Sequence, residues 1–212
     1  MFAREHRMEP TLFARGLILG FTIAAAVGPI SLLCIRRTLA EGRLVGLASG
    51  MGVATADATY GAIAAFGLTA VTDLLVDWRR ALGVVGGLFL LWLAWRTLRS
   101  VPGEAASDAG NGRRGLPAAY LSILGLTLTN PMTILSFAAL FVGLGVTGGD
   151  AAGATLLTLG VFAGSAAWWV LLVTVVGAVR SRLTPAGLRR VNVASGVVIG
   201  AFAIIAIASA LL

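Results

Sequence analysis

Asp57 is the only acidic residue well inside an apolar segment of the chain, since Asp73, Asp77 and Asp150 lie near segment ends. A carboxylate at membrane depth costs about 2.5 to 3.5 kcal/mol on insertion scales, so it usually faces a cavity or a partner. At helical spacing Asp57 shares one face with five small residues, which are Gly46, Gly50, Ala54, Gly61 and Ala64. Because small residues let a second helix approach closely, Asp57 is predicted to point into a helix bundle.

Two roles are open to a carboxylate in that position. It would carry a coupling proton, or it would receive the ammonium group of a substrate. The alternative is a structural one, in which a neutral aspartic acid is hydrogen-bonded to Asn130 or to a backbone carbonyl.

Two prolines interrupt apolar segments, at Gly28-Pro29 and at Asn130-Pro131. Each proline removes a backbone hydrogen bond and clashes with the carbonyl four residues earlier, at Ala25 and at Thr127. Those carbonyls need a partner other than lipid. Interrupted helices at matching positions of two halves indicate a substrate site near the membrane midplane, although a single proline also serves as a plain kink.

Polar side chains accompany both breaks. Free carbonyls hold an ammonium group, and the amides of a restarted helix hold a carboxylate. The alternative is that the hydroxyls bond to their own preceding turn. The candidate substrate-binding or coupling residues are therefore Asp57, Gly28, Pro29, Asn130, Pro131, Thr127, Ser31 and Thr133.

The composition indicates the elements that must position these residues. Hydrophobic residues make up 58% of the 212 residues and charged residues 12%, against about 45–50% and about 25% in soluble domains. Segments of about 20 apolar residues cross a membrane as helices. The sequence thus predicts one all-α membrane domain, residues 1–212, with spans at Leu12 to Ile35, Leu44 to Val71, Ala81 to Leu98, Leu116 to Val146, Ala151 to Val179 and Val191 to Leu212.

The chain is expected to fall into two halves of three helices, residues 12–98 and 116–212, joined by a loop at 99–115. At an offset of 110, five residues of the first half match the second: Gly50, Gly67, Arg79, Arg80 and Gly86 fall on Gly160, Gly177, Arg189, Arg190 and Gly196. An odd number of helices per half predicts two inverted repeats, each with its first helix broken at a proline. Coincidence in a glycine-rich chain is the alternative.

All sixteen basic residues are arginines, and they lie in short clusters between apolar segments. This pattern argues against nucleic-acid binding and for loops anchored at a membrane surface. Eleven arginines fall on one side of the predicted topology and five on the other. Both termini are therefore expected outside, with the 99–115 loop in the cytoplasm and the chain in a bacterial inner membrane.

Few reactive groups are available for other chemistry. Cys34 is the only cysteine and His6, near the amino terminus, is the only histidine. No cofactor, metal site or enzymatic activity is expected, because redox pairs, histidine cages and catalytic dyads all need more groups. The alternatives left open are an efflux carrier for another solute such as a metal cation, and a non-transporting structural membrane subunit.

These segments resemble the lysine exporter (LysE/RhtB) family of bacterial amino-acid exporters over nearly the whole chain. The similar stretches are Gly20-Phe21 through Gly28-Pro29, Arg36-Arg37 to Glu41-Gly42, Gly50-Met51-Gly52 to Asp57 and Gly67-Leu68, Leu82-Gly83 through Trp95-Arg96, and Asn130-Pro131. The chain has Ala26-Val27-Gly28-Pro29 where members typically show Pro-Gly-Pro, and Met132 where a polar residue often follows Asn-Pro.

The resemblance implies six helices and export of substrates such as lysine, arginine, homoserine or threonine, driven by the membrane potential or a proton gradient. It does not specify which substrate this chain moves. A homodimer is also conceivable, since glycine-rich helix faces permit association.

Overall fold

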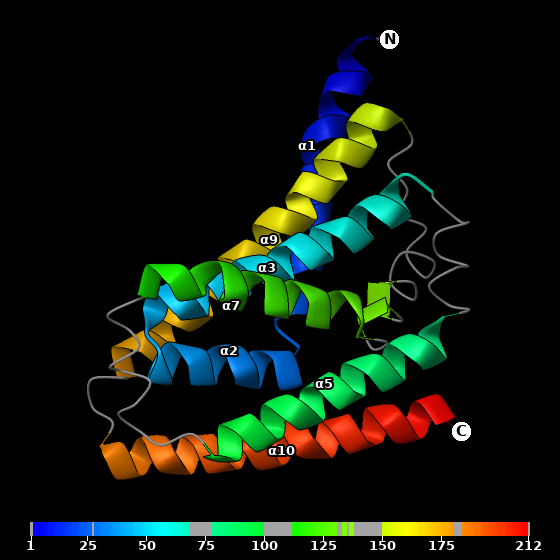
Figure 1. The fold of residues 1–212 in the computed structure, drawn as a ribbon. Coiled ribbons are helices and arrows are strands. Elements are labelled where there is room, and N and C mark those ends of the chain that lie inside the picture. Colours follow the sequence, from blue (N-terminus) through cyan, green and yellow to red (C-terminus); the bar gives the residue numbers. More distant parts are fainter. Residues whose placement is uncertain are drawn as a thin grey trace.

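The computed structural model describes residues 2–26, 28–67, 78–99, 112–130, 133–134, 136–137, 150–179 and 184–211. Within these ranges the chain forms seven helices: α1 (Phe2–Ala24), α2 (Pro29–Ala40), α3 (Arg43–Ala65), α5 (Arg79–Arg99), α7 (Gly112–Leu128), α9 (Ala151–Val179) and α10 (Pro185–Leu211). The all-helical prediction is confirmed. Figure 1 shows α3 crossing the centre, with α1 and α9 running side by side on one flank and α5 and α10 paired on the other.

The first apolar segment is broken where the sequence predicts. The helix α1 ends at Ala24 and α2 starts at Pro29, and the two helix axes differ in direction by 79°. Gly28 is the N-cap of α2 and is extended, and Pro29 occupies the first helical position, where a missing N–H costs nothing. Leu12 to Ile35 is therefore one apolar segment in sequence but two helices in space.

The helix α3 is the centre of the packing. It contacts α9, α7 and α2, and a Cβ atom at Gly50 would meet the ring of Trp169, while one at Gly52 would overlap the carbonyl oxygen of Tyr120. The helix ends at Ala65, earlier than the predicted Val71, because Gly67 follows with a left-handed φ of 64° that glycine adopts without strain.

The other predicted boundaries differ in a consistent direction. The helix α9 has the predicted bounds, whereas α7 begins at Gly112, inside the predicted 99–115 loop, and α10 begins at Pro185 rather than Val191. A hydropathy pattern locates the apolar part of a helix, but helical hydrogen bonding continues into polar residues at the membrane surface.

Three helices of the described ranges are long and apolar enough to cross a membrane, namely α5, α9 and α10, and the bent pair α1 and α2 makes a fourth. The central helix α3 does not meet that criterion. Its glycine, alanine and threonine residues face other helices, so they need not be strongly apolar. The chain is a multi-pass membrane protein, and the count of six spans stays a prediction.

Candidate functional site

Asp57 lies where α3 crosses α9. Its side chain is 1% exposed, and its carboxylate accepts a 2.7 Å hydrogen bond from the hydroxyl of Ser165 on α9. The small residues on its helix face allow this approach, since a Cβ atom at Gly61 would lie 3.3 Å from the side chain of Val161. The predicted inward direction of Asp57 is what the structure shows, but its partner is Ser165, not Asn130 or a backbone carbonyl.

Each helix break lies beside one of two apolar clusters on either side of this polar pair. The first cluster contains Ala24 and Ile30, which flank the Gly28-Pro29 break, together with Val53 and Trp169. The second contains Ile134 and Phe137, which follow the Asn130-Pro131 break, together with Val161. Asp57 and Ser165 therefore sit between the two interrupted segments.

Near the first break the structure places two of the predicted residues in contact with the chain end of α1. Ser31 donates a 3.2 Å hydrogen bond from its hydroxyl to the carbonyl of Ala26, and it is buried. Gly28 and Pro29 supply the backbone turn itself. The hydroxyl of Ser31 thus satisfies a carbonyl released by the break, as expected of polar groups at such positions.

At the second break, the helix α7 stops at Leu128. The Thr127 carbonyl accepts a 3.2 Å hydrogen bond from the N–H of Asn130, and the N–H groups of Thr133 and Ile134 bond to the Asn130 carbonyl. The Thr127 hydroxyl bonds to the Ile123 carbonyl one turn earlier, which is the structural alternative for that group. Pro131 lies outside the described residues.

Sequence reasoning missed Tyr60. It lies one turn after Asp57 on α3 and donates its hydroxyl hydrogen bond to the carbonyl of Leu128, the last residue of α7. Its ring also contacts Phe137 at a centroid distance of 5.6 Å. The i, i+3 spacing of Asp57 and Tyr60 is the signal that places both on one face.

Sequence reasoning also misplaced two arginines. Arg36 and Arg37 were assigned to a loop anchor, but both are 9% exposed within α2. The Arg36 side chain donates to Asn192 of α10, and Arg37 donates to groups of α3 and α7. Long side chains bury their stems and seek polar partners when neighbouring helices supply them.

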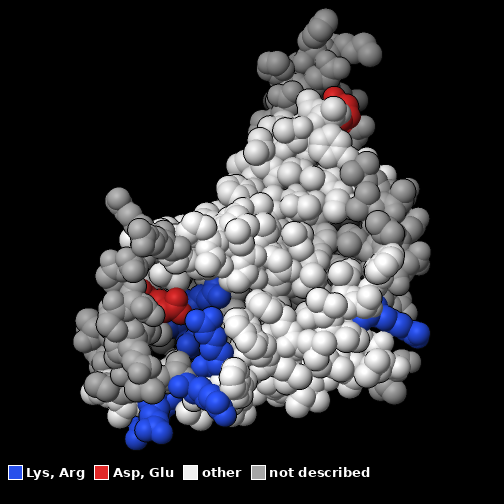
Figure 2. Space-filling view, in the orientation of Figure 1, with Lys and Arg blue, Asp and Glu red and all other residues white. Residues whose placement is uncertain are grey.

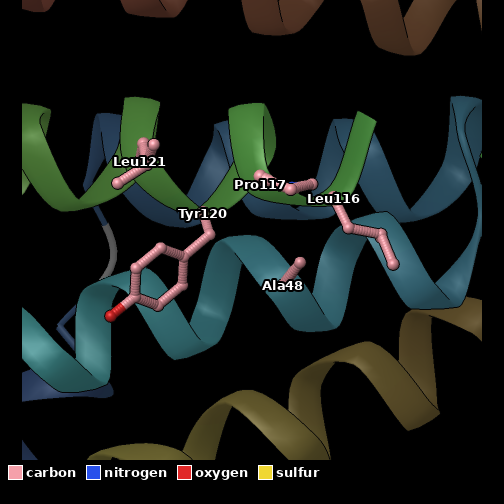
Figure 3. Close-up of a pocket in the computed structure, with 5 residues that line it drawn as sticks. All are labelled: Ala48, Leu116, Pro117, Tyr120 and Leu121. Atoms are coloured by element: carbon pink, nitrogen blue, oxygen red, sulfur yellow. The ribbon is translucent and has the colours of Figure 1, made fainter. Parts of the chain in front are cut away.

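A groove of about 650 Å³ lies between α3 and α7, lined by Ala48, Leu116, Pro117, Tyr120 and Leu121 (Figure 3). The Tyr120 hydroxyl bonds to the hydroxyl of Thr55 at 2.9 Å. Asp57 is not part of this lining, and its 1% exposure means that no open path reaches it in this conformation. A solute reaches the carboxylate only after helices move apart.

Comparison with known proteins adds the decisive observation. A family model described as LysE type translocator matches residues 21–209. The chain belongs to the LysE type translocator family. Members are transporters, so the translocator is not an enzyme.

One relative of the translocator is "Uncharacterized membrane protein YahN" from Escherichia coli (strain K12). The two are 30% identical over 147 residues, which cover 66% of this chain and 64% of the relative. The match therefore spans a little under two thirds of the relative's length. No solved structure matches the chain significantly.

Proposed function

We propose that this translocator is a secondary transporter of the bacterial inner membrane that exports amino acids or related small metabolites by alternating access. The observation that carries the proposal is the buried Asp57–Ser165 pair between two helix breaks. Ionisable residues inside a membrane protein characteristically line substrate or proton pathways, and broken helices at matching positions supply free backbone groups for a polar solute.

Asp57 is the coupling or substrate-sensing charge in this proposal. The hydroxyl of Ser165 satisfies one of its oxygens in the closed state. A substrate ammonium group or a proton would replace or weaken that bond when the site opens. Gly28, Pro29, Asn130 and Pro131 would expose backbone groups nearby, with Ser31, Thr127 and Thr133 as neighbouring hydroxyls.

The helix contacts support an inverted repeat. A Cβ atom at Gly52 of α3 would meet Tyr120 and Leu124 of α7, and one at Gly160 of α9 would meet Phe13 and Leu17 of α1. Each contact becomes the other when the two halves are exchanged, with 108 residues between the glycines and 107 between the helix partners.

The pair α5 and α10 follows the same rule. A Cβ atom at Gly87 would lie 3.2 Å from the Ala203 carbonyl oxygen, and one at Gly196 would lie 3.3 Å from that of Ala94. Both relations involve a separation of 109 residues. These contacts favour Gly87 rather than Gly86 as the counterpart of Gly196.

By the same exchange, Asp57 and Ser165, 108 residues apart, occupy equivalent positions in the two halves. Their hydrogen bond then lies on the pseudo-two-fold axis. In inverted-repeat transporters the substrate site is at the interface of the repeats, which is the position of this pair.

The test is counterflow in proteoliposomes. Vesicles containing the purified translocator are loaded with unlabelled L-lysine or L-threonine, and entry of the same labelled amino acid is followed. Transient accumulation above equilibrium, absent from empty vesicles, is expected of an alternating-access carrier. Simple equilibration would indicate a pore, and no entry of any tested amino acid would favour another solute or a structural subunit.

A further inference from the structure

Arg37 contributes the most extensive set of side-chain hydrogen bonds among the described residues. One terminal nitrogen donates to the Ser49 hydroxyl on α3 and to the Ala119 carbonyl on α7, both at 3.0 Å. The other donates to the Ser122 hydroxyl at 2.9 Å. One guanidinium thus joins α2 and α3 of the first half to α7 of the second.

We infer that Arg37 is a positioning residue for transport: it latches the half-helix α2 against both halves of the protein and so holds one side of the carrier closed. The inference rests on the proposed alternating access, because a latch matters only if α2 moves. Arg37 touches neither Asp57 nor the helix breaks in the printed contacts, so its effect would pass through α2.

The nature of the acceptors makes the latch reversible. All three are neutral hydroxyl or carbonyl groups, and Glu41, one turn further along, acts on Arg37 only as a more distant charge. A buried pair with a carboxylate would be costly to separate, since each charge would lose its partner in a low-dielectric interior. Near the end of α2, by contrast, an outward movement brings the guanidinium to water.

The end of the molecule on which Arg37 acts is strongly basic. Figure 2 shows Lys and Arg side chains gathered at the end where α5 finishes and α10 begins. Arg96 and Arg99 close α5 at this end. By the positive-inside rule this is the cytoplasmic side, so the latch would control entry of solute from the cytoplasm.

The sequence provides no equivalent latch in the second half. From Thr133 to Gly149, which follows the second proline break, there is no charged residue. A device present on one side only distinguishes the two end states of an otherwise repeated structure. Arg37 therefore favours the state that is closed toward the basic side.

The native Cys34 reports on this movement. It lies on α2 three residues before Arg37, toward the break, and it is 0% exposed. It is also the only cysteine of the chain. A thiol reacts with N-ethylmaleimide only when water and reagent reach it, so the alkylation rate of Cys34 measures opening of α2.

The experiment compares alkylation rates of the purified full-length protein in proteoliposomes without any substrate. Arg37→Met should raise the rate at least tenfold and Ser122→Ala about three- to tenfold, since one hydrogen bond to a charged donor corresponds to roughly a tenfold shift in an equilibrium. Arg37→Lys should fall between wild type and Arg37→Met. It also keeps the charge and serves if the methionine variant fails to fold.

Two controls separate a latch from general loosening. Arg96→Gln removes a nearby exposed charge that stacks on Trp92, and it should leave the rate unchanged. In a Cys34→Ser background, Ala203→Cys places a thiol in the α5–α10 contact, whose reactivity should not respond to Arg37→Met.

The double variant Arg37→Met, Ser122→Ala should react no faster than Arg37→Met alone, because both changes break the same bond. Equal Cys34 reactivity in wild type and all Arg37 variants would overturn the inference, as would parallel acceleration at position 203. Because no substrate is used, these results stand apart from the counterflow test. A carrier that exchanges amino acids without Arg37-dependent exposure refutes the latch alone.

Discussion

Asp57 and Ser165 show how a polar pair is accommodated inside an apolar bundle. The carboxylate is buried, its hydroxyl partner comes from another helix, and small residues bring the two helices close enough for a 2.7 Å bond. A buried acceptor that loses its donor keeps the full cost of desolvation. The pair therefore contributes to stability as well as to the proposed transport.

Ser165→Ala should lower the unfolding free energy in detergent by about 1 to 3 kcal/mol, because Asp57 is left without its hydrogen-bond donor. Transport should fall but persist, since the carboxylate remains. Thr174→Ala is the matched control, as this exposed hydroxyl on the same helix bonds only to its own turn, at Val170. Thermal unfolding of both variants checks the prediction, and equal melting temperatures would count against a structural contribution of the pair.

The sequence predicts one member of this pair and not the other. Asp57 stands out because an acidic residue in an apolar segment is rare, and the spacing of nearby glycines indicates its direction. Ser165 is one of many hydroxyl residues in the spans, and its partner is 108 residues away. Nothing local separates it from a serine that bonds to its own turn.

At the scale of helices, glycines determine which pairs approach most closely. A Cβ atom at Gly164 of α9 would overlap the carbonyl oxygen of Leu17, and one at Gly20 of α1 would overlap that of Val161. The contact between α1 and α9 is therefore backbone against backbone. Such contacts drive helix association in membranes through packing, where hydrophobic burial gives no advantage over lipid.

Gly164→Ala should destabilise the protein by about 1 to 3 kcal/mol, because the added methyl group forces α1 and α9 apart. Gly125→Ala is the matched control within α7, where nothing lies within 4 Å of the added Cβ atom. That change should be neutral or stabilising by up to about 1 kcal/mol, since alanine favours the helix. Unfolding in detergent measures both, and a harmless Gly164→Ala would show that the crossing can relax.

Helix existence was more predictable than helix ends. The Gly28-Pro29 break follows from proline geometry, and α9 from a long apolar segment without polar interruption. The end of α3 at Ala65 and the start of α7 at Gly112 depend on a left-handed glycine and on interfacial hydrogen bonding, which hydropathy does not detect. The burial of Arg37 depends on acceptors from α3 and α7, so it required the tertiary structure.

At the scale of the whole molecule, the helix pairs are unchanged by exchange of the halves: α1 with α9 becomes α7 with α3, while α3 with α9 and α5 with α10 each map onto themselves. The duplication predicted from glycine spacing is thus supported by contacts that the spacing did not use. An inverted arrangement further requires an odd number of spans in each half.

The topology gives a separate prediction. Alkaline phosphatase fused after Leu212 should be active, and green fluorescent protein fused there should be dark, because the arginine distribution places both termini outside. Fusions within the 99–115 loop should give the opposite pattern. A C-terminal reporter active only in the cytoplasm would reverse the orientation and move the Arg37 latch to the outer side.

The central claim is that the buried carboxylate of Asp57 operates the carrier. The most direct measurement is amino-acid export and counterflow by Asp57→Asn, which keeps the side-chain size and removes the charge, beside Asp150→Asn at the exposed start of α9. Asp57→Asn protein should remain in the membrane at wild-type levels and lose net transport, while Asp150→Asn should retain it. Full transport by Asp57→Asn would contradict the account.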